Sequence, residues 1–231
     1  MSRPTRRSAT GAWAGRSGFR KRIEQAAALA VRAREDDELA GFVVGLDLAG
    51  DENRGRPKSI APKLEEVFAH CLPVTIHAGE GSSADAVWQA AYHLHADRIG
   101  HGLTLVENQE LMKRFRDRNI CVEMCPSSNL EVVGFYEPGS VDPLCERRYP
   151  LKELWHQGLP LTICTDNPGI SRTTLSREYL LASRLVDGLS RWEALALIKQ
   201  GFAHAFSAAV RREALLKKAD RLIYDLIGGG K

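Results

Sequence analysis

Short apolar runs alternate with helical stretches along most of this chain, and this alternation constrains the fold more than any other sequence feature. Five runs end in polar or glycine residues and are expected to form buried strands. The runs are FVVGLD at 42–47, PVTIH at 73–77, DRIGH at 97–101, ICVEMC at 120–125 and LPLTICTD at 159–166. Helical stretches such as SADAVWQAAYHLHA and NQELMKRFRDR lie between them. Strand and helix that alternate in this way predict the α/β class, with a parallel sheet and crossover helices.

The two ends of the chain differ from this middle part. Residues 1–18 show no periodicity and are rich in Arg, Ser and Gly, so a disordered basic leader is expected there. Residues 1–22 hold seven Lys or Arg and no acid, whereas the whole chain has a net charge of +3, so the remainder is net acidic. A helix is expected over 19–40, and only helices follow the last strand, at about 175–187, 191–200 and 202–218. We therefore predict one folded domain over 19–231.

Composition and cysteine usage exclude several classes of protein. A chain with 44% hydrophobic and 26% charged residues is typical of a globular domain. No apolar run approaches the roughly 20 residues that cross a bilayer, so we expect a cytoplasmic protein without a membrane partner. The five cysteines form no CxxC pair, which favours reduced thiols over disulfides or a Cys-based zinc site. Nucleic-acid binding by the leader is disfavoured, because only Trp13 and Phe19 interleave with its basic residues.

Polar signatures follow each of the five expected strands. They are DLAGDE at 47–52, HAGE at 77–80, GHG at 100–102, CPSSN at 125–129 and TDNP at 165–168. A lone histidine is more often a packed core residue than a ligand, but five signatures at consecutive strand ends are hard to explain by packing. Parallel α/β folds build their sites at the carboxyl ends of strands. We therefore expect the side chains of His77, Glu80, His101 and Asp166 to converge on one cleft there.

In this order and spacing, the motifs GLDLAGDE, TIHAGE, RIGHG, EMCPSSN and CTDNPG resemble the adenosine deaminase family of zinc hydrolases, over roughly residues 19–220. The resemblance implies a (β/α)₈ barrel of the TIM type that hydrolyses the 6-amino group of the purine nucleoside adenosine, giving inosine and ammonia. The roles that it implies are Zn²⁺ ligation by His77 and Asp166, proton transfer to purine N1 by Glu80, orientation of the zinc-bound hydroxide by His101, contact with N3 through the Gly50 backbone, and contact with N7 by Asn167.

The chemistry of these residue types agrees with the implied roles. Zinc lowers the pKa of its bound water to near 7, and imidazole and carboxylate are suitable zinc ligands. Attack at purine C6 dearomatises the ring, so N1 must be protonated as the bond forms, which a nearby carboxylic acid such as Glu80 can do. Simpler interpretations also exist: Asp166 precedes Asn-Pro and can be a turn former, and Glu80 can simply lie near a helix N-terminus.

Three features depart from the family pattern. Asn167 stands where the family usually has a second Asp; an amide can donate to N7, but the change leaves other purine nucleosides open as substrates. Tyr149 stands where many relatives have His, and the sequence assigns it no role. The family's first strand carries an HxH motif with two further zinc ligands, yet the first histidine here is His70. The HxH at His93-Leu94-His95 is expected in a helix, where residues i and i+2 point about 200° apart and cannot hold one ion.

The resemblance begins before the fourth strand of the family's barrel, so a partial barrel with strands 4–8 is expected. Its first and last strands would have unpaired edges, which favour self-association or pairing with another chain. Fewer than the usual three protein ligands would also weaken zinc binding. Three hypotheses stay open: a truncated deaminase that is impaired alone, a non-catalytic purine-binding or interaction protein that completes its barrel with another chain, and a deaminase of another aminopurine nucleoside.

Overall fold

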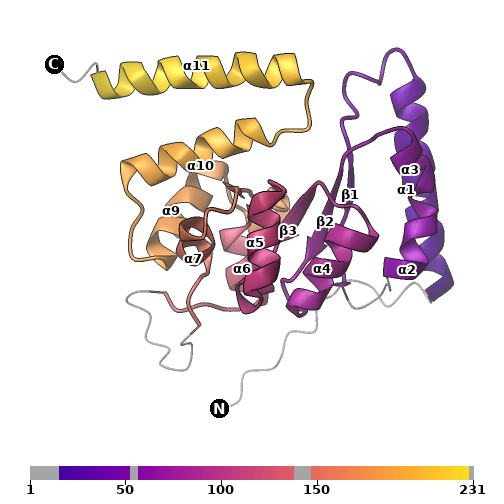
Figure 1. The fold of residues 1–231 in the computed structure, drawn as a ribbon, viewed down its shortest axis with the longest axis horizontal. Helices are drawn as coiled ribbons and strands as arrows, with labels where there is room; N and C mark the ends of the chain where they lie inside the picture. The colour runs from indigo at the N-terminus through magenta and orange to yellow at the C-terminus, as the bar shows by residue number, and fades with distance from the viewer. Residues whose placement is uncertain (1–15, 53–56, 138–146, 229–231) are drawn as a thin grey trace.

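A sheet of five parallel strands forms the centre of the molecule (Figure 1). The computed structural model describes residues 16–52, 57–137 and 147–228. The strands are β1 (Leu46–Leu48), β2 (Val74–Ala78), β3 (Arg98–His101), β4 (Cys121–Met124) and β5 (Leu161–Ile163). Each strand pairs with the next one along the chain, and within the described residues β1 and β5 do not pair with each other. The α/β class is confirmed, and the open sheet agrees with a partial barrel. Self-association through its outer strands stays a prediction.

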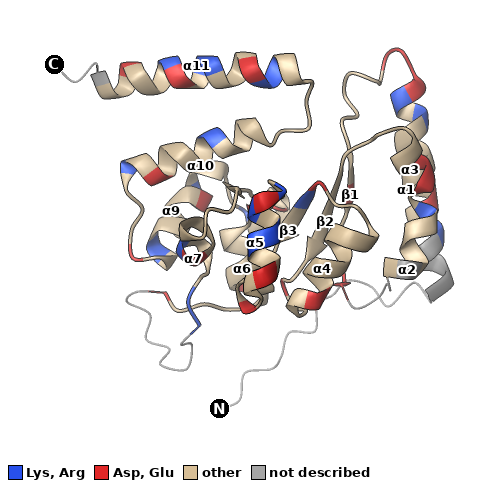
Figure 2. Ribbon diagram, viewed as in Figure 1, with Lys and Arg blue, Asp and Glu red and all other residues tan. Residues whose placement is uncertain are grey.

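Helices connect successive strands and follow the last one (Figure 1). They are α1 (Arg16–Glu35), α2 (Pro57–Ile60), α3 (Glu65–Ala69), α4 (Ala84–His93), α5 (Gln109–Asp117), α6 (Pro126–Val132), α7 (Leu151–His156), α8 (Pro168–Ser171), α9 (Leu175–Leu185), α10 (Arg191–Ala203) and α11 (Ala209–Gly228), with 3₁₀ helices η2 (Ala61–Lys63) and η3 (Leu103–Glu107). Lys, Arg, Asp and Glu are spread along α1, α5 and α11, whereas the strands are mostly uncharged (Figure 2). This distribution is typical of helices that bury one face and expose the other.

The outer strands are shorter than the apolar runs that predict them. The interpretation of residues 42–45 as strand is wrong, because pairing with β2 begins only at Leu46. Phe42 is 83% exposed, so this part of the apolar run does not enter the core. On the other outer strand, regular pairing ends at Ile163, and the backbone turns at Asp166 with φ 52°. Apolar runs mark buried or strand-like segments, but backbone pairing decides where a strand begins and ends.

The terminal helices also differ in their limits from the sequence prediction. Helix α1 begins at Arg16 and ends at Glu35, so the expected leader over 1–18 is wrong for residues 16–18, and the expected helix over 19–40 is wrong for residues 36–40. Residues 1–15 lie outside the described residues. The prediction of one helix over 202–218 is wrong, because α10 ends at Ala203 and α11 begins at Ala209. Short-range bonds such as Ser207 N–H to the Ala205 carbonyl oxygen turn the chain between the two helices.

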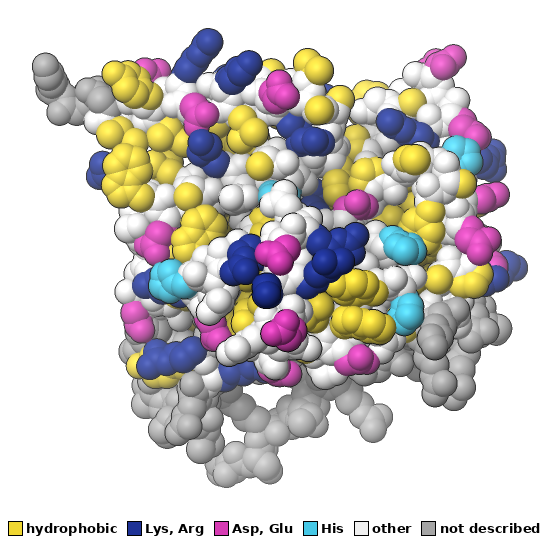
Figure 3. Space-filling view, viewed as in Figure 1, with side chains coloured by type: hydrophobic (Ala, Val, Ile, Leu, Met, Phe, Trp, Pro, Cys, Tyr) yellow, Lys and Arg dark blue, Asp and Glu magenta, His cyan; other side chains and the backbone are white. Residues whose placement is uncertain are grey.

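Helix α11 packs along α10 at one end of the molecule (Figure 1). Ala219 is the one residue of α11 that is buried within the described part of the chain, and Tyr224 is 76% exposed. Apolar side chains are visible on the surface over α10 and α11 (Figure 3). Within the described residues, no helix is both long and apolar enough to cross a lipid bilayer.

Candidate active site

The polar signatures predicted from the sequence lie together at the carboxyl edge of the sheet. His77 is near the end of β2, His101 ends β3, and Asp166 follows β5. His101 and Asp166 have positive φ angles of 69° and 52°, which are uncommon for residues other than glycine and are found often at functional sites. Gly100 pairs with His77, and a Cβ there would lie 2.8 Å from His77 Cδ2. The glycine therefore makes room for the His77 ring.

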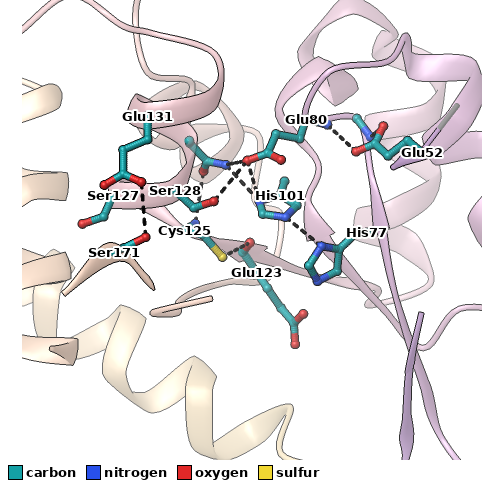
Figure 4. A network of polar contacts seen from close by, with 12 residues as sticks. Glu52, His77, Glu80, His101, Glu123, Cys125, Ser127, Ser128, Glu131 and Ser171 are labelled. Atoms are coloured by element: carbon teal, nitrogen blue, oxygen red, sulfur yellow. Dashed lines mark hydrogen bonds and ion pairs between the residues drawn. The ribbon is translucent and has the colours of Figure 1, made fainter. Parts of the chain in front are cut away.

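Three of the predicted site residues are in one polar network (Figure 4). His101 Nε2 lies 3.0 Å from His77 Nδ1, and the two rings are nearly perpendicular. His101 Nδ1 lies 3.3 Å from Glu80 Oε1, and His101 is almost fully buried. The expected convergence of His77, Glu80 and His101 is therefore observed.

A fourth residue, Asn129, joins this network and was not predicted as a site residue. Its Nδ2 donates to Glu80 Oε1 and lies next to His101 Nδ1, each at 2.9 Å. Its Oδ1 accepts from the Cys125 N–H at 3.2 Å and from the Tyr149 hydroxyl at 3.0 Å. Because a backbone N–H can only donate, the Cys125 contact identifies the amide oxygen and turns the NH₂ group towards Glu80. The Asn129 amide thus links the Glu80 carboxylate and the His101 ring to the Cys125 backbone and the Tyr149 hydroxyl.

Tyr149, to which the sequence assigned no role, donates its hydroxyl hydrogen to the Asn129 amide oxygen. Its side chain is buried, and burial raises the pKa of the hydroxyl well above the ordinary value, so it stays a donor. The sequence contained one signal for Asn129, its place at the end of the CPSSN signature. No local pattern indicated Tyr149, because it lies 20 positions from Asn129 and meets it only in the folded chain.

Asn129→Leu is expected to destabilise the protein by about 1–3 kcal/mol, since the buried Tyr149 hydroxyl and Cys125 N–H would lose their shared acceptor. Tyr149→Phe removes one donor and leaves the Cys125 bond, so its cost should be smaller, about 1 kcal/mol. Urea unfolding of both variants checks this order. An equal or larger loss in Tyr149→Phe would show that the bond from the Cys125 N–H adds nothing to stability.

The electrostatic surroundings of Glu80 and His101 favour neutral forms of both. Burial raises the pKa of Glu80, and although the bond from Asn129 lowers it, the Asp166 and Glu52 carboxylates add to the rise. Burial, followed by the neighbouring His77, lowers the pKa of His101 to about 4. A carboxyl group that keeps its proton to higher pH is suited to act as a general acid. A neutral imidazole can donate through one ring nitrogen and accept through the other.

Asp166 and His77 line the same cavity, of about 360 Å³, and are of suitable type for a metal. Burial lowers the pKa of His77, but the carboxylate of Asp47, 3.7 Å from Nε2, together with those of Asp166 and Glu123, raises it above its ordinary value. Across residues 16–52, 57–137 and 147–228, however, no group of three or more His, Cys, Asp or Glu side chains is arranged to hold a metal ion. The described donors therefore fit zinc in type but not in number.

The HxH histidines lie away from this cavity. Helix α4 ends at His93, and His95 lies beyond it with φ 52°, so the prediction that both lie within one helix is wrong for His95. Both line a separate cavity beside Phe68, and His95 packs edge-on against the Phe68 ring. Neither histidine is part of the His77 network.

The two predicted substrate-binding residues lie at the border of the network. Gly50, with φ 120°, lines a cavity of about 260 Å³ together with His77 and Ser82. Asn167 is exposed at the start of α8, where its Oδ1 accepts from the Ile170 N–H at 3.3 Å. With its oxygen bonded to this helix, the Asn167 amide has its NH₂ group to offer a ligand. The structure brings neither residue into direct contact with Glu80 or His101 within the described part of the chain.

Comparison with known sequences places this arrangement among deaminases. The profile of the family described as "Adenosine deaminase" matches residues 12–222. An adenine deaminase of Rhizobium leguminosarum bv. trifolii is 35% identical over 177 residues, covering 77% of this chain and 52% of that protein. An adenosine deaminase of Enterococcus faecalis is 33% identical over 204 residues, covering 88% of this chain and 57% of that protein. The chain spans about half the length of the curated relatives it matches.

Solved structures of related proteins share the fold. An adenine deaminase from Arthrobacter aurescens superposes with a TM-score of 0.72 at 21% identity, covering 88% of this chain and 59% of that one. A Zn-bound amidohydrolase from Burkholderia ambifaria gives 0.72 at 23% identity, covering 89% and 56%. Arabidopsis ADAL in complex with IMP gives 0.69 at 27% identity, covering 87% and 54%.

Proposed function

Since this chain belongs to the adenosine deaminase family, we propose that it takes part in the hydrolytic deamination of a 6-aminopurine, with adenosine or deoxyadenosine as substrate and inosine or deoxyinosine and ammonia as products. The observation that carries the proposal is the contact of Glu80, which follows β2, with His101 at the end of β3 and with Asn129 after β4. A partly buried carboxyl group with a raised pKa, next to a neutral imidazole, is the pair that such a reaction needs.

In the proposed reaction, water adds to purine C6 and the amino group leaves as ammonia; one proton of the water returns to Glu80, and the other is taken up by the leaving amino group. Glu80 donates a proton to N1 as the C6–O bond forms, because charge would otherwise build up on the ring. His101 orients the attacking oxygen, a positioning effect that complements the proton transfer. Zn²⁺ is the proposed cofactor, held in part by His77 and Asp166, and when bound it supplies a water of lowered pKa.

Recognition of the purine ring is assigned to two groups outside the Glu80–His101 network. The backbone N–H of Gly50 would donate to N3, and the Asn167 amide would donate to N7. The names of the relatives include both adenine and adenosine deaminases, so adenine is the second candidate substrate. A non-catalytic purine-binding protein is the alternative from a different class.

The proposal is tested by supplying the purified full chain with zinc and following adenosine loss by absorbance. Adenine, deoxyadenosine and AMP are assayed in parallel, and the products are separated by chromatography. Formation of inosine would support the proposal, and turnover of adenine alone would reassign the substrate. Binding of adenosine without turnover of any aminopurine would contradict it in favour of the non-catalytic alternative.

His77→Ala and Asp166→Ala are each expected to lower the zinc affinity of the chain by more than about 10-fold, because each removes one proposed ligand. Competition with a chromophoric chelator measures the affinity. His95→Ala is the matched control, since His95 lines a cavity that His77 does not reach. Loss of zinc in the His95 variant but not in the His77 variant would contradict the ligand assignment.

A further inference from the structure

The carboxylate of Glu52 lies against the loop that holds Glu80 in the proposed active site (Figure 4). The sequence did not predict this contact. Its Oε1 accepts the backbone N–H of Glu80 at 3.0 Å, and its Oε2 accepts the backbone N–H of Gly79, also at 3.0 Å. The Ser82 hydroxyl donates to Oε2 as well. Consecutive backbone N–H groups in a turn form an anion-binding concavity, and here a side chain of the same protein occupies it.

These bonds join two segments that are 28 positions apart in the chain. Glu52 lies two residues after Gly50, at the end of the segment that follows β1. Glu80 lies two residues after β2. Gly50 and Glu80 are the groups assigned to N3 and N1, which belong to the same ring of the purine. The distance between the two segments therefore decides whether both groups can reach one ring.

We propose that Glu52 is a positioning residue for the purine: its carboxylate clamps the Glu80 backbone and so keeps Glu80 in register with Gly50. The proposal rests on the proposed function. Both carboxylate oxygens are engaged, and hydrogen bonds to an ionised acceptor are about twice as strong as neutral ones. A clamp of this kind limits how far the two loops can move apart before a ligand binds.

Glu52→Gln tests the clamp with little change in volume. The amide offers one acceptor oxygen and one NH₂ group, which cannot accept, so one of the two backbone N–H groups loses its partner. Glu110→Gln is the matched control: Glu110 is exposed in the first turn of α5, and it does not line the cavity of Gly50 and Glu52. Glu52→Asp keeps two oxygens on a shorter side chain and should recover part of the effect.

The full chain, with zinc supplied, is studied by amide hydrogen exchange and by titration with purine riboside, a nucleoside that lacks the 6-amino group. In Glu52→Gln we expect exchange at residues 79–80 to accelerate and purine riboside affinity to fall, each by about 10-fold. The urea midpoint should fall slightly, because one N–H group loses its partner, and exchange in the strands should accelerate less than exchange at residues 79–80. Wild type and Glu110→Gln should behave alike.

Purine riboside affinity equal in wild type and Glu52→Gln would overturn the proposal while leaving the proposed function intact. Exchange that accelerates as much in the strands as at residues 79–80 would also overturn it, because Glu52 would then act on stability alone. If wild type itself binds no purine riboside, the proposed function fails and the positioning role fails with it.

Discussion

Glu80→Gln is expected to lower kcat for adenosine by about 10²–10⁴-fold, the usual contribution of a general acid. The Gln carbonyl oxygen can still accept the Asn129 bond that Glu80 Oε1 accepts at 2.9 Å, so the side chain should stay in place. What the variant loses is the proton for purine N1. We therefore expect KM and the urea midpoint to change little. Steady-state kinetics measures kcat and KM, and an unfolding curve shows whether the protein remains equally stable.

Glu107→Gln is the matched control for this variant. Glu107 is exposed and lines a cavity of about 490 Å³ that Glu80 also lines. Its replacement should leave kcat within about 2-fold of wild type, since surface changes away from the network have small effects. If kcat of Glu80→Gln were close to that of Glu107→Gln, another group would have to donate the proton to purine N1.

Phe115→Ala is expected to destabilise the protein by about 3–5 kcal/mol. Phe115 is fully buried on α5, within the core between the helices and the sheet. Removal of the ring takes away apolar contacts and leaves a cavity that surrounding strands and helices cannot fill without distortion. Urea unfolding followed by circular dichroism measures the change.

Leu180→Ala provides the comparison for Phe115, because Leu180 is 67% exposed on α9. We expect a change within about 0.5 kcal/mol for this variant. If Phe115→Ala destabilised the protein no more than Leu180→Ala, the packing of α5 on the sheet would have to differ from the one described.

The strand ends show how far sequence reasoning reaches for this site. His77, Glu80 and His101 were predicted because each belongs to a short signature directly after an apolar run. Parallel strands bring their carboxyl ends to one edge, so topology alone predicts that such residues lie close together. The contacts of His101 with His77 and Glu80 agree with that expectation.

The same reasoning could not find the residues that support this network. Asn129 and Glu52 belong to quoted signatures, but which atoms they contact depends on how the loops turn after each strand. Tyr149 lies in a segment with no strand-end signature at all. The HxH histidines, which the sequence analysis excluded as ligands of one ion, lie in a separate cavity.

The sequence by itself determined the α/β class, the succession of five strands along the chain and the edge at which the site lies, because apolar periodicity and strand-end signatures are local properties of the chain. Only the tertiary structure decided which polar atoms meet: Asn129 with Glu80 across 49 positions, and Glu52 with Glu80 across 28. The physical reason is that a hydrogen bond requires two atoms within about 3 Å in a suitable direction. Loop conformation and packing set that geometry, and no local pattern in the sequence encodes it.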